Sequence, residues 1–218
     1  MEPPPPEVSA ALSRLTRLDD VVAVAVMPDV HLAHEVCIGT VIATRRLLYP
    51  AAIGGDVGCG VALIRTDADA DAVADEAVSA AILSGMSRLI PGLKQPDPLP
   101  LPLPLQSHTL SSARLEKRKR REGKLQLGTL GRGNHFLELL SDDTGAVWIM
   151  AHTGSRSMGP TIPAHHRARA GHRSGGLEAI EADAPEGVAY RDDLRWAATY
   201  ARLSRQRILA AAAALLVQ

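Results

Sequence analysis

The stretch Gly54-Gly55-Asp56-Val57-Gly58-Cys59-Gly60 runs without a break into Val61-Ala62-Leu63-Ile64, and so joins a glycine-rich turn to an apolar strand. Glycine permits sharp turns and positive φ, so the Asp56 carboxylate and the Cys59 thiol can converge on one point. A divalent cation bound there would take the thiol proton and gain a strong sulfur ligand. The same residues have a second interpretation, because aspartate beside glycine commonly forms turns and a single cysteine commonly packs as a small apolar residue.

Apolar stretches bounded by proline, glycine or charged residues predict several strands along the chain. Two long helices are also expected, because apolar residues recur on one helical face between Asp71 and Ile90 and again between Asp192 and Val217. The sequence therefore predicts an α+β fold, with a mixed β-sheet core flanked by helices. The predicted strands are residues 21–26, 36–43, 60–65, 135–140 and 146–151.

The composition excludes a global electrostatic attraction to nucleic acid or membrane, because the 218 residues include 24 basic and 24 acidic side chains. Cys37 and Cys59 are the two cysteines, and the amino terminus lacks the pattern of a secretory signal. The longest apolar run, Ile208 to Val217, is about half of what a bilayer-spanning helix needs. We expect a cytoplasmic protein with free thiols and no membrane segment; a disulfide between the two cysteines is the alternative.

A proline-rich and basic segment divides the chain. Alternate prolines from Pro96 to Pro104 exclude a helix or a central strand there and predict an extended linker or surface loop. Seven basic residues follow in eleven positions from Arg114 to Lys124, on a short helix capped by Ser111 or Ser112. We interpret this helix as a solvated face rather than a phosphate-binding patch, because no aromatic residues are interleaved for base stacking. The expected division is residues 1–95, an insert at 96–124, and residues 125–218.

Three further segments place donor side chains in turns at the ends of predicted strands. They are Met27-Pro28-Asp29-Val30-His31, Gly128-Thr129-Leu130-Gly131-Arg132-Gly133-Asn134-His135-Phe136-Leu137-Glu138 and Ala151-His152-Thr153-Gly154-Ser155-Arg156. Histidine is a common ligand of first-row metals, and glycine loops expose amides that can cradle phosphate oxygens. Taken singly, a histidine such as His31, His135 or His152 is more often a hydrogen-bonded core or turn residue than a ligand, and Asn134 has an alternative role in an Asx-turn. Four donor-bearing turns at strand ends nevertheless match an active site built on a rigid sheet. The histidines of a poorly patterned basic stretch are expected at the surface: His165, His166 and His172.

These four motifs, in this order, resemble those of the RtcB-type RNA ligases. The resemblance implies an RtcB-like fold. It also implies a ligase that joins RNA ends bearing a 2′,3′-cyclic phosphate or a 3′-phosphate to a 5′-hydroxyl end, in tRNA splicing or RNA repair. The cofactors implied are GTP and two manganese ions.

The resemblance assigns roles to individual residues. Asp56, Cys59 and His135 correspond to ligands of one manganese ion. Cys59 and His152 correspond to ligands of the second, so that the thiolate bridges the two ions, offsets their repulsion and fixes their separation. Arg156 resembles a residue that holds an RNA backbone phosphate. The guanylate-contacting segment corresponds to Asn134, His135, Phe136, Leu137 and Glu138, with the asparagine near phosphate and the glutamate at the guanine edge.

The family's guanylated histidine and one further histidine ligand lie in segments without a counterpart in these 218 residues. The resemblance thus covers about the first half of the family's catalytic domain, and we expect a fold that is incomplete at the carboxyl end. The leading hypothesis is a truncated frame or one half of a split ligase, inactive without a separate carboxyl-terminal half. The alternatives are a non-catalytic metal- or RNA-binding remnant or partner subunit, and a metal-dependent phosphoesterase with Asp29 and His31 as candidate acid and base.

Overall fold

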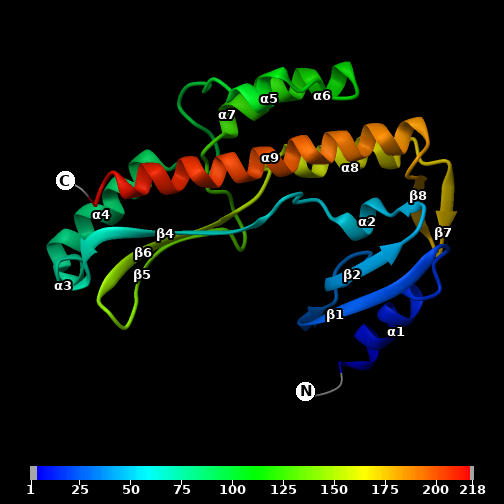
Figure 1. The fold of residues 1–218 in the computed structure, drawn as a ribbon, viewed down its shortest axis with the longest axis horizontal. Coiled ribbons are helices and arrows are strands. Elements are labelled where there is room, and N and C mark those ends of the chain that lie inside the picture. Colours follow the sequence, from blue (N-terminus) through cyan, green and yellow to red (C-terminus); the bar gives the residue numbers. More distant parts are fainter. Residues whose placement is uncertain (1–3, 217–218) are drawn as a thin grey trace. The chain divides into compact units, whose positions relative to one another are not determined.

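The computed structural model describes residues 4–216, which form two compact units. The first unit comprises Met1–Gly55 and Pro160–Asp193, and the second comprises Asp56–Gly159 and Leu194–Gln218. Figure 1 follows the chain through both units. The elements of the first unit are α1 (Pro6–Leu15), β1 (Val21–His31), β2 (Ile38–Thr44), β3 (Leu47–Leu48), α2 (Pro50–Ile53), β7 (His172–Ser174) and β8 (Leu177–Glu181).

The second unit contains the longer strands and most of the helices. Helices α8 (Met158–Arg167) and α9 (Pro185–Ala213) each contribute residues to both units. The remaining elements are β4 (Gly60–Asp69), α3 (Ala70–Ala74), α4 (Glu76–Leu89), α5 (Leu103–Ser107), α6 (Ala113–Arg118), the π-helical turn η1 (Lys119–Gly123), α7 (Lys124–Gln126), β5 (Phe136–Ser141) and β6 (Ala146–Thr153).

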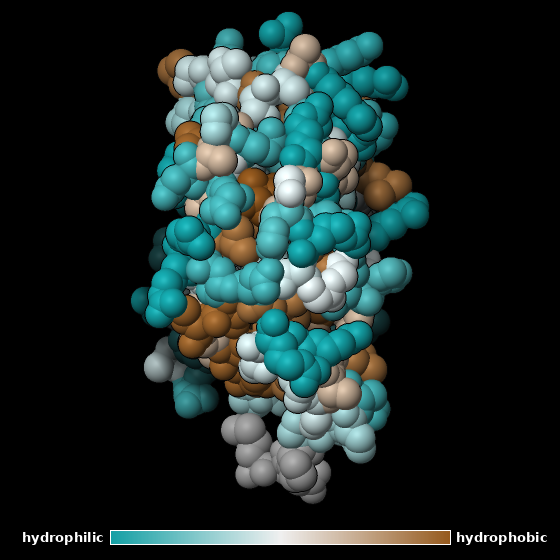
Figure 2. All heavy atoms as spheres, turned by 90° about the vertical axis from the view of Figure 1, so that its right-hand side faces the viewer, coloured by the Kyte–Doolittle hydropathy of each residue, from teal (hydrophilic) through white to brown (hydrophobic). Residues whose placement is uncertain are grey.

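The first unit is built on two small antiparallel sheets, in the orders β1-β2 and β3-β8-β7. Its buried apolar cluster consists of Leu15, Leu18, Leu47, Tyr49, Leu177 and Ala179. Strands β1 and β2 also leave large apolar side chains exposed, among them Met27 and Ile38. On the side of the molecule that Figure 2 faces, apolar side chains reach the surface as a brown area in the lower half of the view.

The sheet of the second unit has the order β4-β6-β5, and all its strand pairs are antiparallel. The register aligns Ile64 with Ile149 and Leu139, and this face packs against α4 and α9. Ile149 and Ile208 are fully buried there. Burying such side chains stabilises the unit by roughly 1.5–3 kcal/mol each, so this face anchors the sheet to both helices.

The opposite face of the same sheet is open. Its first row aligns Val61 with His152 and Phe136, because neighbouring residues along a strand point to opposite faces. Val61 is 56% exposed and Leu63, two residues further along β4, is 48% exposed. The candidate ligand His152 therefore lies on the side of the sheet that no helix covers in the described part of the chain.

The α+β class and the five predicted strands are confirmed, although the described strands form three small antiparallel sheets rather than a mixed one. The prediction of one continuous helix from Asp71 to Ile90 is wrong, because this span contains the two helices α3 and α4. Asp69 and Asp75 cap α3 and α4 separately, since each carboxylate accepts two backbone N–H groups. Asp75 ends one helix and begins the next, which breaks the predicted span.

The carboxyl-terminal helix begins earlier than the predicted start at Asp192. Helix α9 begins at Pro185, a residue type that suits the first helical turn, and ends at Ala213. Val217, the last residue of the predicted span, lies outside the described residues. Among the described residues, no helix is both long enough and apolar enough to cross a membrane.

The expectation that all the histidines between 165 and 172 lie at the surface is wrong for His166, which is fully buried. Its Nδ1 atom lies 2.5 Å from a carboxylate oxygen of Glu186, and its Nε2 atom lies 2.8 Å from one of Asp193. A buried imidazole needs such partners. The basic, irregular sequence around it gave no indication of them, because both carboxylates come from α9.

The basic segment is solvated on one side only. Ser112 caps α6, as predicted, and Arg114, Lys117 and Arg118 are exposed. Lys119, however, is 4% exposed, and its ammonium group donates to the carbonyl oxygen of His108 at 2.6 Å and to Glu116 at 2.8 Å. The interpretation as a solvated face is therefore wrong for this one lysine.

Candidate metal centre

The four predicted ligands lie in loops and strand ends at one edge of the β4-β6-β5 sheet. Asp56 and Cys59 belong to the loop between α2 and β4, and His135 immediately precedes β5. His152 lies near the end of β6, where its register partners are Val61 and Phe136. Because β4 begins, β5 begins and β6 ends at this edge, the antiparallel pairing itself brings the ligand-bearing segments together.

Their side chains converge closely. Oδ2 of Asp56 lies 2.8 Å from Nε2 of His135. The Sγ atom of Cys59 lies 3.6 Å from that same nitrogen and 3.1 Å from Nε2 of His152. Donor atoms of Asp56, Cys59 and His135 all lie within 4.8 Å of one another. A carboxylate oxygen, a thiol sulfur and imidazole nitrogens in this arrangement fit a divalent first-row metal ion.

Glycines keep the space around the carboxylate open. The backbone N–H of Ser155 donates to Oδ1 of Asp56 at 3.1 Å, which fixes the orientation of the carboxylate. A Cβ atom on Gly154 would collide with both oxygens of that group. Gly131 leaves space for the second ligand in the same way, because a Cβ atom at that position would collide with the ring of His135. The two glycines are thus required by neighbouring side chains.

Arg156 lies directly beside the centre. It is a non-glycine residue with φ +56°, a strained conformation that tends to occur at functional sites. Its Nη1 atom lies 3.3 Å from Nδ1 of His135, and its Nε atom donates to the Thr129 hydroxyl at 3.3 Å. A guanidinium can only donate, so Nδ1 of His135 accepts. The Nε2 atom of His135 then carries the ring proton and donates it to Asp56.

The thiol is held in its protonated form while no metal is bound. Desolvation by burial, reinforced by the negative charge of Asp56, raises the pKa of Cys59 to about 11. Cys59 is an exposed free thiol. A metal ion must therefore displace the Cys59 proton when it binds, and its affinity for the site rises with pH.

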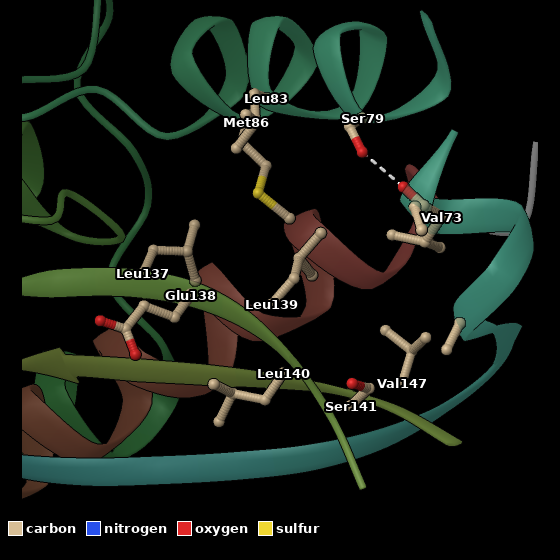
Figure 3. Close-up of a pocket in the computed structure, with 12 residues that line it drawn as sticks. Val73, Ser79, Leu83, Met86, Leu137, Glu138, Leu139, Leu140, Ser141 and Val147 are labelled. Atoms are coloured by element: carbon tan, nitrogen blue, oxygen red, sulfur yellow. Dashed lines mark hydrogen bonds between the residues drawn. The ribbon is translucent and has the colours of Figure 1, made fainter. Parts of the chain in front are cut away.

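The predicted guanylate-contacting residues divide between two faces of β5. Phe136 lies on the face of His152, with the two ring centroids 5.3 Å apart. Leu137 packs against the hydrophobic core on the other face, while Asn134 and Glu138 are exposed. Figure 3 shows Leu137 and Leu139 directed toward α4, whereas Leu140 points away from it.

A cavity of about 470 Å³ lies beside this strand, between β5 and α4. Its lining is mainly apolar, including Leu83, Met86 and Leu139, and Glu138 is its single charged residue. Figure 3 shows the Glu138 carboxylate directed away from Val73 and Ser79 at the other end of the cavity. The cavity is therefore lined from both faces of β5, by Leu137 and Leu139 on the core face and by Glu138 and Leu140 on the face of Phe136.

The structure brings together Asp56, Cys59, His135 and His152, with Arg156 in contact. Asp29 and His31, the candidate acid and base of the phosphoesterase alternative, lie in β1 of the first unit, where the His31 ring contacts the carbonyl oxygen of Asp29 at 2.8 Å. Sequence reasoning missed Arg205, whose side chain contacts the backbone beside two ligands. No local motif marks this arginine, because it occurs 52 or more positions after the residues that it contacts.

The chain is similar to known RNA ligases over most of its length. The family model described as tRNA-splicing ligase RtcB matches residues 11–99 and 105–218. The RNA-splicing ligase RtcB of Escherichia coli K12 is 32% identical over 211 residues, which cover 85% of this chain and 51% of the relative. The RNA-splicing ligase RtcB of Mycobacterium tuberculosis is 28% identical over 239 residues, with 83% and 55% covered.

An archaeal relative, the tRNA-splicing ligase RtcB of Archaeoglobus fulgidus, is 29% identical over 187 residues. The chain spans about half the length of the curated relatives that it matches. The family match includes both glycine-rich loops, the strands that follow them and the helix that carries Arg205. The match over nearly the whole chain, together with the convergence of three of the four motifs on one cluster, shows that this chain belongs to the RtcB family of RNA-splicing ligases.

Proposed function

We propose that this chain provides the metal-binding and RNA-end-binding part of an RtcB-type ligase. The reaction joins RNA ends with a 2′,3′-cyclic phosphate or 3′-phosphate to 5′-hydroxyl ends and depends on GTP and Mn²⁺. One observation carries the proposal: Cys59 Sγ lies 3.1 Å from His152 and 3.6 Å from His135, which itself contacts Asp56. The sulfur atom of Cys59 is thus close both to the ligands Asp56 and His135 and to the ligand His152.

In this proposal Asp56, Cys59 and His135 hold one manganese ion. Cys59 and His152 hold the second, with the thiolate shared. The two ions, when bound, neutralise and polarise phosphate oxygens during phosphoryl transfer. The thiol ligand must remain reduced, which is consistent with two free cysteines and with action in the cytoplasm.

Arg156 binds the RNA end in this proposal. Its guanidinium suits a phosphate group because two parallel N–H donors match two phosphate oxygens. It lies within 3.3 Å of the His135 ring, so a phosphate bound by the arginine would lie next to the metal ligands. Asn134, Phe136 and Glu138 contact the guanine nucleotide, and their position at the start of β5 keeps this segment adjacent to His135.

We further propose that residues 1–218 alone do not become guanylated, since no counterpart of the family's guanylated histidine occurs among them. RNA joining then needs a separately supplied carboxyl-terminal half of the ligase. The partners are RNA with the stated ends, GTP and this second polypeptide.

Metal binding is the first test. Titration of the purified chain with Mn²⁺, followed by the electron paramagnetic resonance signal of the free ion, should show bound manganese. Cys59→Ser and His152→Ala should each weaken binding by at least about 10-fold. His172→Asn, an exposed histidine of the first unit, is the matched control. Undiminished binding by Cys59→Ser would exclude the shared-thiolate arrangement.

Ligation is the second test. The chain is incubated with labelled GTP, Mn²⁺ and RNA that carries the stated ends. The incubation is done with the chain alone and with the chain plus the carboxyl-terminal half of the Escherichia coli relative. RNA joining that appears only with both polypeptides supports the proposal. Mn²⁺ binding without any joining would favour the non-catalytic metal- or RNA-binding module, and a GMP adduct on the chain alone would disprove the proposed division of roles.

A further inference from the structure

Helix α9 presents small residues to the loop that carries Asp56 and Cys59. A Cβ atom added to Gly58 would lie 2.8 Å from Cα of Ala198 and 3.1 Å from Cβ of Ala201. Gly58 also has φ +73°, a conformation that glycine adopts without strain. The loop backbone therefore rests directly on the helix. Arg205 follows Ala201 by four positions, so it lies on the same face of α9.

The Arg205 side chain joins two of the ligand-bearing segments. Its Nη1 atom donates to the carbonyl oxygen of Gly58 at 2.7 Å and to that of Thr153 at 2.6 Å. Gly58 immediately precedes Cys59, and Thr153 immediately follows His152. A guanidinium Nη1 carries two hydrogens, so one nitrogen can serve both carbonyl groups. One atom thereby links the backbone neighbours of two candidate ligands.

The sheet does not provide this link by itself. The β4–β6 pairing ends at Gly60 and Thr153, so the Asp56–Cys59 loop lies beyond the last paired residue. A carbonyl group that leaves a sheet still needs a hydrogen-bond partner when it is shielded from water. Arg205 supplies this partner at the point where strand pairing stops.

The same helix reaches the third ligand-bearing segment one residue earlier. The Ser204 hydroxyl accepts a hydrogen bond from the backbone N–H of Gly128 at 3.0 Å, and it is fully buried. Gly128 begins the glycine-rich loop that leads to His135. Successive residues of α9 therefore contact all three segments from which the ligands come.

We propose that Arg205 is a positioning residue of the metal centre, which holds Asp56 and Cys59 at a fixed separation from His152. This inference rests on the metal-binding function proposed above. Both hydrogen bonds of Arg205 go to backbone carbonyl oxygens, so it acts on the ligands through the backbone that carries them. Its contribution is to preorganise the ligands, so that metal binding does not have to order the loop.

The test compares Arg205→Met, which keeps the apolar stem and removes both hydrogen bonds, with Arg205→Lys and with Arg202→Met. Arg202 lies on the same helix, is exposed and has no hydrogen bond or ion pair within the described part of the chain. Two quantities are measured on each full chain: the affinity for Mn²⁺, and the near-ultraviolet charge-transfer absorption of Co²⁺ bound to the Cys59 thiolate.

We expect Arg205→Met to weaken Mn²⁺ binding by about 10- to 100-fold, the range found for residues that support metal ligands. It should also reduce the Co²⁺–thiolate absorption at saturating cobalt. Arg205→Lys should retain part of the Mn²⁺ affinity and part of the Co²⁺–thiolate absorption, because lysine is also a charged donor. Arg202→Met should match the unmodified chain in both quantities. Wild-type affinity and full thiolate absorption in Arg205→Met would overturn the inference.

Two further outcomes distinguish this inference from failure of the proposed metal centre and from a role of Arg205 in folding alone. If the unmodified chain binds no Mn²⁺, the proposed metal centre fails and the inference fails with it. If Arg205→Met lowers the unfolding temperature, Mn²⁺ binding is measured well below the thermal unfolding transition of the variant. The bound metal is then expressed per folded molecule. A role in folding alone then predicts normal affinity and normal thiolate absorption in the folded fraction, which would also overturn the proposal.

Discussion

Nη1 of Arg156 lies 3.3 Å from Nδ1 of His135, so the arginine proposed to hold RNA contacts a candidate metal ligand directly. The contact assigns the ring proton of metal-free His135 to Nε2, where Asp56 accepts it at 2.8 Å. A metal ion bound at Nε2 cannot coexist with that proton. Metal binding is therefore coupled to the position of Arg156.

Zinc, a diamagnetic probe, should move the His135 proton from Nε2 to Nδ1. Nδ1 then no longer accepts from Arg156, and the guanidinium becomes available to a phosphate. Long-range proton–nitrogen correlation spectra of the imidazole rings, recorded with and without Zn²⁺, measure the change. The ring of His172, an exposed histidine of the first unit, serves as reference. Persistence of the His135 Nε2 proton at saturating zinc would contradict the proposed ligand role.

Cys59 should react slowly with iodoacetamide although it is exposed. Its pKa of about 11 lies two units above the ordinary value of 9.0, so about 100-fold less thiolate is present at pH 8. The alkylation rate should rise roughly tenfold per pH unit from pH 7 to about pH 10. Mass spectrometry distinguishes it from Cys37, which is buried. A rate that levels off near pH 9 would mean that the thiol is not desolvated.

Lys119→Met should destabilise the second unit by roughly 3 kcal/mol, because it leaves the partly buried carboxylate of Glu116 without its closest cation. The lysine is 4% exposed and donates to two oxygens. Urea unfolding measures the difference. Lys117→Met, at an exposed position of the adjoining helix α6, should change stability by less than about 0.5 kcal/mol. Equal effects of the two substitutions would show that burial is not the cause.

Asp142 should make the β5–β6 hairpin sensitive to acid. Its carboxylate accepts hydrogen bonds from Thr144, Ala146 and the Trp148 indole, and these hold its pKa far below the usual 3.8. Because the folded pKa lies below the unfolded one, the stabilisation is complete above about pH 5 and is lost as the pH falls through 4 and below. Asp142→Asn should reduce this loss of stability at low pH.

Thermal unfolding at pH 7 and at pH 3 measures this acid dependence. Asp143→Asn, at the exposed neighbouring position, is the control and should retain the acid dependence of the unmodified chain. An acid dependence that is unchanged in Asp142→Asn would show that other carboxylates control the transition.

The sequence was sufficient for the parts of the site that depend on short-range pattern. Each ligand motif combines a donor, a glycine-rich turn and an adjacent apolar strand, and antiparallel pairing of those strands brings His135 and His152 to the Asp56–Cys59 loop. The fold class followed from the same periodicity. Strand patterns are local, so they can be found without knowledge of the pairing.

What the sequence could not indicate depends on contacts between distant segments. Arg205 and Ser204 are ordinary residues of a long helix until the loops that they contact are placed. The burial of His166 has the same origin, because its carboxylate partners lie 20 and 27 positions away. Lys119 has a local partner in Glu116, but it also donates to the carbonyl oxygen of His108, 11 positions earlier, which no pattern indicates. Composition correctly describes a basic segment as hydrophilic but does not identify which of its side chains point inward.

The crowding at Gly154 predicts that this position accepts few other residues. Gly154 lacks a positive φ, so its backbone conformation would accept any amino acid. The restriction comes from the Asp56 carboxylate, which occupies the space that a Cβ atom would need. A mutational scan of this position would therefore report on a residue 98 positions earlier in the chain. Only where the aspartate itself changed to a smaller residue could alanine or serine become acceptable at position 154, so the two positions are expected to vary together or not at all.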